Sequence, residues 1–305
     1  MEHDVIIIGG SFAGLSAAMQ LARARRDVLV LDTGSTRNRF AASSHGFPGQ
    51  DGRSPAMIRE ILRAELGKYP TIRFRDAEAM AASRQAEGFA VLLAEGEKVA
   101  ARRLVLAYGL RDTLPDLPGL SERWGTSVLH CPYCHGYELN GQPVGVLARN
   151  ELAMHQAMLL PDWGPTTLFT QGVFDPTSDQ RQALVARGVS VEDAPVTGLI
   201  GPAPKLDAVR LADGRDVPLA GLFLAPQTAP TSDLVASLGC RTNDGPTGPY
   251  LAVDGMQATS VPGVFAAGDL AAPMANATLA AAAGVMAGGS AHRSLIFDPE
   301  LTQTA

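Results

Sequence analysis

The chain has 305 residues, of which 46% are hydrophobic and 18% are charged, and its formal net charge is −6. This is the composition of a globular protein long enough for two domains. Because no block of Lys or Arg is present, nucleic acid and anionic membrane surfaces are excluded as expected partners. The first residues, "MEHDVIIIGG", lack the basic region of a signal peptide, and their apolar run is too short for a bilayer, so we expect a cytoplasmic protein.

The first thirty residues predict a βαβ unit. Val5 to Ile8 form a continuous β-branched run, which is typical of a parallel strand buried on both faces. Apolar residues then recur at helical spacing between Leu15 and Ala22, and residues 28–31 form a second apolar run that ends at Asp32. Strand, glycine turn, helix and strand therefore follow one another as in a nucleotide-binding fold.

The turn between this strand and this helix, "GGSFAG", is close to the dinucleotide fingerprint G-x-G-x-x-G, with Ser11 in place of the second glycine. Gly9 suits the tight turn, Gly14 suits close helix–strand packing, and the helix N-terminus supplies backbone donors for phosphate. Asp32 is placed to bind a ribose hydroxyl. A tight turn without a ligand is the alternative, and the register of all these elements favours a nucleotide. The residues predicted to bind it are Gly9, Gly10, Ser11, Phe12, Ala13, Gly14 and Asp32.

Residues 33–112 predict the rest of the first domain. A loop precedes a helix from Pro55 to Gly67, which Ser54 opens as the N-cap. The stretch "TIRF" is predicted as a strand, and residues 88–107 as a small meander that ends in a buried strand. The following "YGLRDTLPDLPGL", with its two prolines, predicts a crossover between domains.

The second half of the chain repeats the alternation of strands and helices. Its predicted strands are "QPVGVLA", "TTLFT" and "GLFLAP", and its predicted helices are "ELAMHQAMLL" and "SDQRQALVARG". "TSVPGVFAAGDL" then predicts a turn and a strand with an acidic end, followed by a small-residue helix from Asn276 to about Ala291.

This last strand and helix have no neighbouring unit of their own to pack against. We therefore expect them to return and complete the first domain. The predicted fold class is α/β, with two Rossmann-like (three-layer ββα) nucleotide-binding domains, the second inserted into the first. Residues 1–112 and 245–305 are expected to form the first domain, and residues 113–244 the inserted one.

The end of the strand in "GVFAAGD" carries a second predicted part of the nucleotide site. Asp269 can bind the ribityl or pyrophosphate region of a flavin, and the N-terminus of the following helix, near Asn276 and Ala277, can face the pyrimidine edge. A small-residue helix that only packs is the alternative. As the second half of a split nucleotide domain, the segment favours a flavin.

The cysteine pair in "HCPYCHGYE" allows four interpretations. C-x-x-C-H is a haem attachment pattern, but attachment usually requires export. A zinc site usually needs four ligands, and adjacent residues such as His130 and His135 do not easily surround one ion. A static disulfide is rare in the cytosol. Redox cycling of Cys131 and Cys134 is therefore favoured, and a helix starting at Pro132 would lower the pKa of a cysteine at its N-terminus.

In this order and spacing, "GGSFAG", "CPYCHG" and "TSVPGVFAAGD" resemble the low-molecular-weight thioredoxin reductases over nearly the whole chain. The resemblance implies FAD in a split N- and C-terminal domain, an inserted domain of related fold that carries the cysteine pair, and a homodimer. It also places further residues at the cofactor, namely Arg39, His45, Ala107, Gly109 and Gly268.

The sequence departs from these reductases at the expected nicotinamide site. The turn Ala148 to Ala153 contains no glycine, and Glu151 would bring a negative charge toward a pyrophosphate, although Arg149 can still hold some phosphate. The next strand, "TTLFTQGVFDP", ends without the arginines that would bind a 2′-phosphate.

With this degenerate turn, "CPYCHGYE" resembles a narrower group, the thioredoxin-reductase-like dithiol oxidases that close disulfides in small natural products of the gliotoxin, holomycin and romidepsin kind. In that group a small-molecule dithiol reduces the cysteine pair, the pair reduces FAD, and molecular oxygen reoxidises it. The resemblance makes Cys134 the sulfur that faces the flavin and Cys131 the one that exchanges with substrate.

His135 stands where the reductases carry an aspartate, so proton transfer is its expected role, with a structural histidine as the alternative. For His130 the structural role is favoured, and Cys240 is expected to be a buried small hydrophobe. Two other functions compete with the oxidase. One is an NADPH-dependent disulfide reductase with a divergent turn, and the other is a non-catalytic flavin sensor, for which a cysteine shuttle would have no use.

Overall fold

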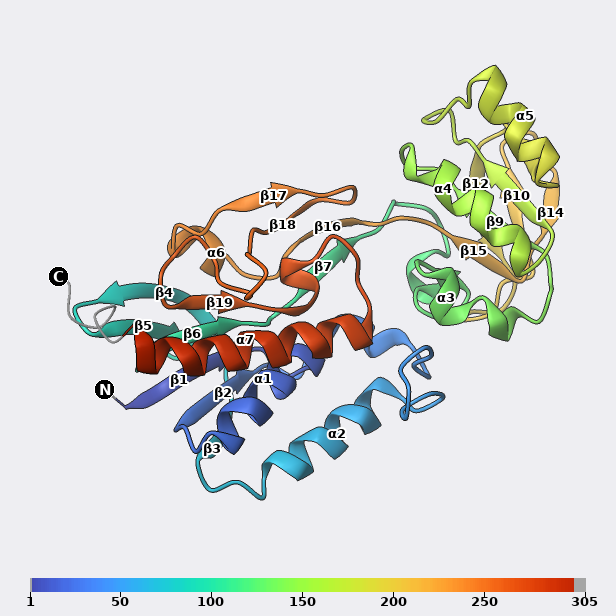
Figure 1. Cartoon of the computed structure of the whole chain (residues 1–305). Helices are drawn as coiled ribbons and strands as arrows, with labels where there is room; N and C mark the ends of the chain where they lie inside the picture. The colour runs from blue at the N-terminus through green and yellow to red at the C-terminus, as the bar shows by residue number, and fades with distance from the viewer. Residues whose placement is uncertain (1, 299–305) are drawn as a thin grey trace.

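The computed structural model describes residues 2–298, and within this range the chain forms two lobes joined by extended segments (Figure 1). The larger lobe has the strands β1 (His3–Ile8), β2 (Val28–Asp32), β3 (Ile72–Asp76), β4 (Ala79–Gln85), β5 (Gly88–Leu93), β6 (Lys98–Leu106), β17 (Thr242–Asp244), β18 (Pro249–Leu251) and β19 (Val264–Ala266). Its helices are α1 (Phe12–Arg23), α2 (Pro55–Leu66), α6 (Leu234–Ser237) and α7 (Ala277–Phe297), with the 3₁₀ helices η1 (Arg37–Phe40) and η5 (Gly268–Ala271).

The smaller lobe lies between the strands β7 (Leu110–Thr113) and β16 (Gln227–Pro230). Its strands are β8 (Val128–Leu129), β9 (Val144–Leu147), β10 (Thr166–Phe169), β11 (Ser190–Glu192), β12 (Val196–Ile200), β13 (Ala208–Leu211), β14 (Asp216–Pro218) and β15 (Gly221–Phe223). Its helices are α3 (Pro132–His135), α4 (Leu152–Leu159) and α5 (Ser178–Ala186), with the 3₁₀ helices η2 (Ser121–Arg123), η3 (Tyr137–Leu139) and η4 (Leu160–Asp162).

The sheet of the larger lobe separates two apolar cores. Its strands lie in the order β3-β2-β1-β6-β5-β4, with β19 also paired to β6. Strands β3, β2, β1, β6 and β19 are parallel, whereas β4, β5 and β6 form an antiparallel meander. Helices α1 and α7 pack together on one face, and the meander and α6 enclose the core on the other (Figure 1). This is the predicted three-layer arrangement.

The smaller lobe repeats this plan on a smaller scale. Its parallel strands lie in the order β11-β10-β9-β15-β8, and β12, β13 and β14 form a separate antiparallel sheet. One core lies between the parallel sheet and the helices α4 and α5, and the other lies under the antiparallel sheet. The predicted α/β fold with two related domains is therefore confirmed. No helix within residues 2–298 has the length and apolarity required to span a membrane.

Several local predictions can be compared with the structure. Helix α2 begins after Ser54, whose Oγ accepts a hydrogen bond from the Met57 N–H at 3.2 Å, as the N-cap prediction required. Cys240 is 9% exposed and packs in the core of the larger lobe. Helix α7 extends to Phe297, beyond the predicted end near Ala291.

The segment between β16 and residue 244 packs with the larger lobe, although it falls within the predicted insertion, residues 113–244. Leu234, Val235 and Cys240 lie in the same core as β1 and β6. Strand β16 pairs antiparallel with β7, so the chain leaves and re-enters the larger lobe at one place. The physical reason is that the apolar side of α6 is buried against β4 of the large sheet.

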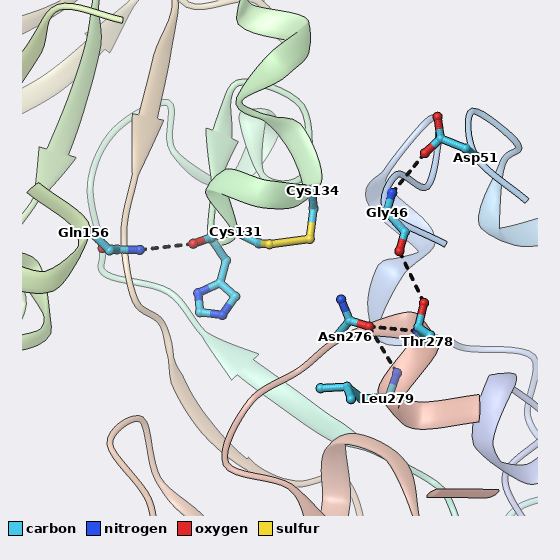
Figure 2. Close-up of a disulfide and its surroundings, with 9 residues drawn as sticks. Gly46, Asp51, Cys131, Cys134, Gln156, Asn276, Thr278 and Leu279 are labelled. Atoms are coloured by element: carbon cyan, nitrogen blue, oxygen red, sulfur yellow. Dashed lines mark hydrogen bonds between the residues drawn. A yellow bond between two sulfur atoms is a disulfide. The ribbon is translucent and has the colours of Figure 1, made fainter. Parts of the chain in front are cut away.

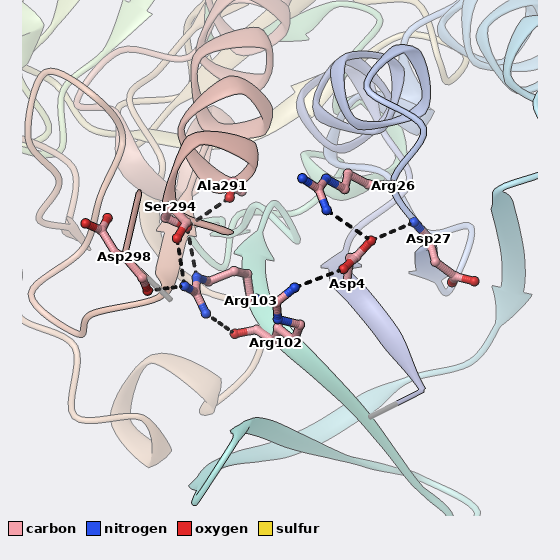
Figure 3. A network of polar contacts seen from close by, with 8 residues as sticks. All are labelled: Asp4, Arg26, Asp27, Arg102, Arg103, Ala291, Ser294 and Asp298. Atoms are coloured by element: carbon pink, nitrogen blue, oxygen red, sulfur yellow. Dashed lines mark hydrogen bonds and ion pairs between the residues drawn. The ribbon is translucent and has the colours of Figure 1, made fainter. Parts of the chain in front are cut away.

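The C-terminal end of α7 is held by a buried arginine of β6 (Figure 3). Arg103 Nε donates to Ser294 Oγ at 2.8 Å, and Nη2 donates to the backbone oxygens of Ser294 and Asp298 at 2.9 and 2.8 Å. Burial lowers the pKa of Arg103 to about 10. Because the last carbonyls of a helix have no partner within it, these bonds explain why α7 continues past the predicted end.

Candidate active site

The glycine turn after β1 brings backbone close to backbone. A side chain at Gly9, which has φ of +111°, would collide with the carbonyl of Ala107 at the end of β6. A Cβ at Gly10 would lie 2.5 Å from Asp32 Oδ2, and a Cβ at Gly14 would collide with the carbonyl of Gly9. The turn is therefore compact for the reasons that the fingerprint predicts, with Gly14 serving helix–strand packing.

Asp32 lies at the end of β2, and its side chain is almost fully buried. Its Oδ1 accepts from the Gly34 N–H at 3.1 Å, and its Oδ2 lies 3.3 Å from Arg63 Nη1 and 3.5 Å from Arg59 Nη1. The two arginines of α2 had no signal in the sequence analysis. They place two cations beside the Asp32 carboxylate, next to the glycine turn where the prediction places a ribose.

A cavity of about 680 Å³ begins at the glycine turn and extends to the cysteine pair. It is lined by both lobes. All of the predicted site residues line it except Gly14, which lies behind the turn; those that do are Gly9, Gly10, Ser11, Phe12, Ala13, Asp32, Arg39, His45, Ala107, Gly109, Cys131, Cys134, His135, Gly268, Asp269, Asn276 and Ala277. The structure thus brings together segments from both ends of the chain around one space.

Cys131 and Cys134 form a disulfide in the wall of this cavity, with their Cα atoms 5.3 Å apart. Cys131 is the N-cap of α3, and Pro132 occupies the first turn, as predicted. The segment is fixed from behind, because Gln156 of α4 donates to the carbonyl of His130 at 3.0 Å. Figure 2 shows the disulfide facing the side of the larger lobe that carries Gly46 and Asn276.

Two histidines flank the disulfide in the cavity wall. Burial lowers the pKa of His135, and burial together with the Arg37 cation lowers the pKa of His130. Both side chains are therefore neutral near pH 7 and able to accept a proton. The Nδ1 atom of His130 is buried and has no hydrogen-bond partner within residues 2–298.

His45 connects the loop after η1 to the cysteine segment. Its Nε2 lies 3.0 Å from Ser43 Oγ and 3.4 Å from Glu138 Oε1, and its Nδ1 lies 3.5 Å from Asp51 Oδ1. The next residue, Gly46, accepts a hydrogen bond from Thr278 Oγ1 at 3.3 Å (Figure 2). This loop therefore contacts both α7 and the inserted lobe at the edge of the cavity.

The N-terminus of α7 is capped by its own side chain. Asn276 Oδ1 accepts from the N–H groups of Thr278 and Leu279 at 2.8 and 3.1 Å (Figure 2). These two donors are therefore occupied. The N–H of Ala277 is not used in this cap, and it is the first-turn donor that remains for a ligand at this end of the cavity.

A charged cluster in the cavity wall was missed by the sequence analysis. Arg37 of η1 donates from Nε and Nη2 to Asp112 of β7 at 2.6 to 3.1 Å, and from Nη1 to Asp269 of η5 at 2.9 Å. The three residues are far apart in the sequence, so no local pattern could indicate the contact. The result is that Oδ2 of Asp269 is bound to an arginine and Oδ1 is not.

The first βα turn of the inserted lobe has few features that would bind a dinucleotide. Arg149 Nη1 donates to the backbone oxygen of Thr113 in β7 at 2.8 Å, and Asn150 Oδ1 accepts from the Leu152 N–H at 3.0 Å. Glu151 is the N-cap of α4 and is exposed. Beyond the end of β10, Thr170 Oγ1 donates to Asp193 at 3.1 Å, and the nearby cation, Arg181 of α5, is already paired with Asp193 and Asp175 at 3.3 and 2.8 Å.

The fold and the cavity define a class, the flavoproteins that exchange electrons with a disulfide through a cysteine pair on an inserted domain. Residues 3–154 match the family model described as pyridine nucleotide-disulphide oxidoreductase. The chain is 33% identical to "Thioredoxin reductase tcpT" of Claviceps purpurea, over 97% of this chain and 95% of that protein.

Two solved structures are also similar to the chain. An oxidoreductase from Agrobacterium tumefaciens is 48% identical with a TM-score of 0.94, covering 97% of this chain and 99% of that one. The structure of HlmI is 39% identical with a TM-score of 0.90, covering 98% and 94%. This chain therefore belongs to the pyridine nucleotide-disulphide oxidoreductases, among the thioredoxin-reductase-like proteins.

Members of this family bind FAD, and FAD is the cofactor of this protein. The residues present fit it. Side chains are absent at Gly9 and Gly10, where they would collide with neighbouring backbone or with Asp32. The cavity is continuous from this turn to Asp269 and the cysteine pair, so the nucleotide end and the redox end lie in one space.

Proposed function

We propose that this protein is an FAD-dependent dithiol oxidase that closes a disulfide in a small-molecule dithiol. One observation carries the proposal: the Cys131–Cys134 disulfide and the predicted flavin-binding residues line the same cavity. A cavity wall is more accessible to a small thiol than to a folded protein, which supports a small-molecule substrate. The similarity to tcpT and HlmI over most of the chain supports an enzyme of the thioredoxin-reductase-like group.

The cysteine pair carries out the exchange with substrate. One substrate thiolate attacks Cys131 Sγ, the Sγ–Sγ bond breaks, and Cys134 leaves as a thiolate. The second substrate thiol then attacks the mixed disulfide and releases the sulfur of Cys131. The substrate has lost two electrons and two protons and gained an S–S bond, and the enzyme holds a reduced pair.

Proton transfer falls to the histidine beside the pair. His135 is neutral at pH 7, because burial lowers its pKa, and it lines the cavity next to Cys134. It takes the proton of the incoming thiol and returns it to solvent through the open side of the cavity. When bound, FAD would supply a two-electron acceptor for the reduced pair, and its reoxidation by molecular oxygen would yield hydrogen peroxide.

The second candidate function is an NADPH-dependent disulfide reductase, which the name of the tcpT relative favours. The residues at the expected nicotinamide site of the inserted lobe argue against this function. Arg149 is bound to the Thr113 carbonyl, Glu151 stands at the N-terminus of α4, and Asp193 lies beyond β10. A dinucleotide would meet Glu151 where it needs backbone donors, and Arg181, the cation near Asp193, is already paired with Asp193 and Asp175.

Anaerobic spectroscopy separates the two functions. We expect dithiothreitol to bleach the yellow flavin within seconds, and air to restore the colour with one hydrogen peroxide formed per dithiol. NADPH and NADH are expected to leave the flavin oxidised over the same time. Rapid bleaching by NADPH would contradict the oxidase and favour the reductase. Free FAD under the same conditions serves as the control.

We also propose that the enzyme acts as a homodimer in the cytoplasm. The outer side of α7 supports a dimer, because Leu279, Met286, Ile296 and Phe297 are between 41% and 68% exposed on it. Light scattering is expected to give twice the chain mass of 31.9 kDa, and Met286→Glu is expected to shift the protein toward the monomer. A wild-type mass of one chain at micromolar concentration would exclude the dimer. The free thiol of Cys240, buried in the core of the larger lobe, suits a reducing compartment.

A further inference from the structure

The charged cluster of Arg37, Asp112 and Asp269 joins three parts of the chain that have different tasks. Arg37 lies in η1, at the start of the loop that follows the glycine-turn βαβ unit. Asp112 belongs to β7, the strand that leads out to the inserted lobe, and Asp269 belongs to η5, just before α7. Both Arg37 and the two carboxylates line the cofactor cavity.

The electrostatics make the arginine hard to replace. The side chains of Arg37, Asp112 and Asp269 are 17%, 10% and 22% exposed, so none is well solvated. Asp112 and Asp269 repel each other, and Arg37 is the cation that both carboxylates share, which raises its pKa further above the usual value. Removing the guanidinium would leave two partly buried carboxylates facing one another across its place.

The contact continues into the inserted lobe. Residue 113 follows Asp112, and its carbonyl accepts the hydrogen bond of Arg149 at 2.8 Å. Arg149 lies two residues beyond β9, and β9 belongs to the same parallel sheet as β8, which precedes the cysteine segment. The path of bonds thus runs from Asp269 through Arg37, β7 and Arg149 to the loop after β9, whose sheet contains the strand β8 that leads into the cysteine segment.

We propose that Arg37 is a positioning residue that couples the cofactor pocket to the crossover strand β7 and so fixes the cysteine pair over the cofactor. Its Nη1 binds Oδ2 of Asp269 at 2.9 Å and leaves Oδ1 of this cavity-lining carboxylate without an arginine partner. Its bidentate bond to Asp112 sets where β7 leaves the larger lobe. The inference concerns FAD and the cysteine pair alone, so it holds whether electrons finally go to oxygen or come from a nicotinamide.

Two variants divide the cluster in different ways. Arg37→Gln removes the ion pairs of Arg37 with both Asp112 and Asp269. We expect FAD binding to the apoprotein to weaken by roughly thirtyfold or more, because the two partly buried carboxylates lose the cation that they share. Asp112→Ala removes the bond between Arg37 and the crossover strand β7, and it leaves the Arg37–Asp269 bond. We expect FAD affinity within about threefold of wild type, but a flavin reduction rate at saturating dithiothreitol that falls about tenfold. FAD affinity is measured by fluorescence titration and the rate by anaerobic stopped flow.

A matched control is the exposed bidentate pair Arg210–Asp216 on the inserted lobe, with bonds of 2.8 and 2.9 Å. Arg210→Gln is expected to change neither readout. If Arg37→Gln does not fold, Arg37→Lys, which keeps the charge but cannot bond both carboxylates as a fork, is expected to show an intermediate loss of affinity.

Wild-type FAD affinity in the Arg37 variants, or a wild-type reduction rate in Asp112→Ala, would overturn the proposal. Equal losses of thermal stability in the apoproteins of Arg37→Gln and Arg210→Gln, with no change in FAD affinity, would also overturn it, because Arg37 would then act only on the fold. A failure of the oxidase proposal would show instead as bleaching by NADPH, which none of these variants addresses.

Discussion

Cys134→Ser is expected to bind FAD normally and to lose its reduction by dithiothreitol, with a rate at least ~10³-fold below wild type. The reason is the position of the pair: both sulfurs line the cofactor cavity, and the disulfide is the acceptor for substrate thiols. Serine has nearly the size of cysteine but cannot form the disulfide, so the exchange step has no electrophile. The measurement is anaerobic stopped-flow bleaching of the flavin, with bound FAD quantified from the absorption spectrum.

Two companion variants sharpen this result. Cys131→Ser is expected to show the same loss, because either sulfur alone cannot be reduced as a disulfide. Cys240→Ala serves as the control, since this buried thiol lies in the core of the larger lobe and outside the cavity lining. Reduction of the flavin at the wild-type rate in Cys134→Ser would mean that thiols reach the flavin directly, and the shuttle scheme would be wrong.

The parts of the fold that were predictable are those encoded in short contiguous patterns. The β-branched run of β1, the glycine turn and the second strand lie within residues 3–32, and the structure pairs β1 with β2 in parallel. The N-cap at Ser54 and the proline in the first turn of α3 were likewise readable, because capping depends on residues within one turn. In these places local preference and tertiary packing agree.

The parts that were missed depend on contacts between distant residues. Strand β4, with the sequence AMAASRQ, shows no alternation and forms only because β5 pairs with it. Helix α7 continues to Phe297 because Arg103, 191 positions before Ser294, binds its last carbonyls. The Arg37 cluster joins residues 75 and 232 positions apart. Sequence patterns of a few residues carry no information on such contacts.

The candidate site shows the same division. Its glycines, Asp269 and the cysteine pair stand in recognisable motifs, and the structure gathers them around one cavity. Arg59 and Arg63, which flank Asp32, stand in no motif, and the motif that contains His130 does not indicate that its Nδ1 lacks a hydrogen-bond partner within residues 2–298. Charged and polar groups that tune a site are selected by their place in space, so they are found only once the fold is known.

His135→Asn is expected to slow flavin reduction by dithiothreitol about thirtyfold near pH 7, because about 3% of an ordinary thiol is thiolate there, and this deficit depends on pH. Burial lowers the pKa of His135, so in the folded protein the imidazole stays neutral below pH 6.5, where an ordinary histidine becomes protonated. The wild-type rate should therefore stay nearly level down to about pH 6.5 and fall only below the lowered pKa. The variant has no base, so its rate must follow the thiolate fraction of the substrate.

The two pH profiles should converge at high pH. Below an ordinary thiol pKa of about 8.5, the thiolate fraction falls tenfold per pH unit, so the variant's rate should do the same between pH 6 and 8 and approach wild type above about pH 9. His155→Asn, on the exposed side of α4, is expected to keep the wild-type profile. His130→Asn tests the alternative base: if it, and not His135→Asn, gives the steep profile, the proton acceptor is the histidine with the unpartnered Nδ1. A level profile in His135→Asn would remove proton transfer from the role of this residue.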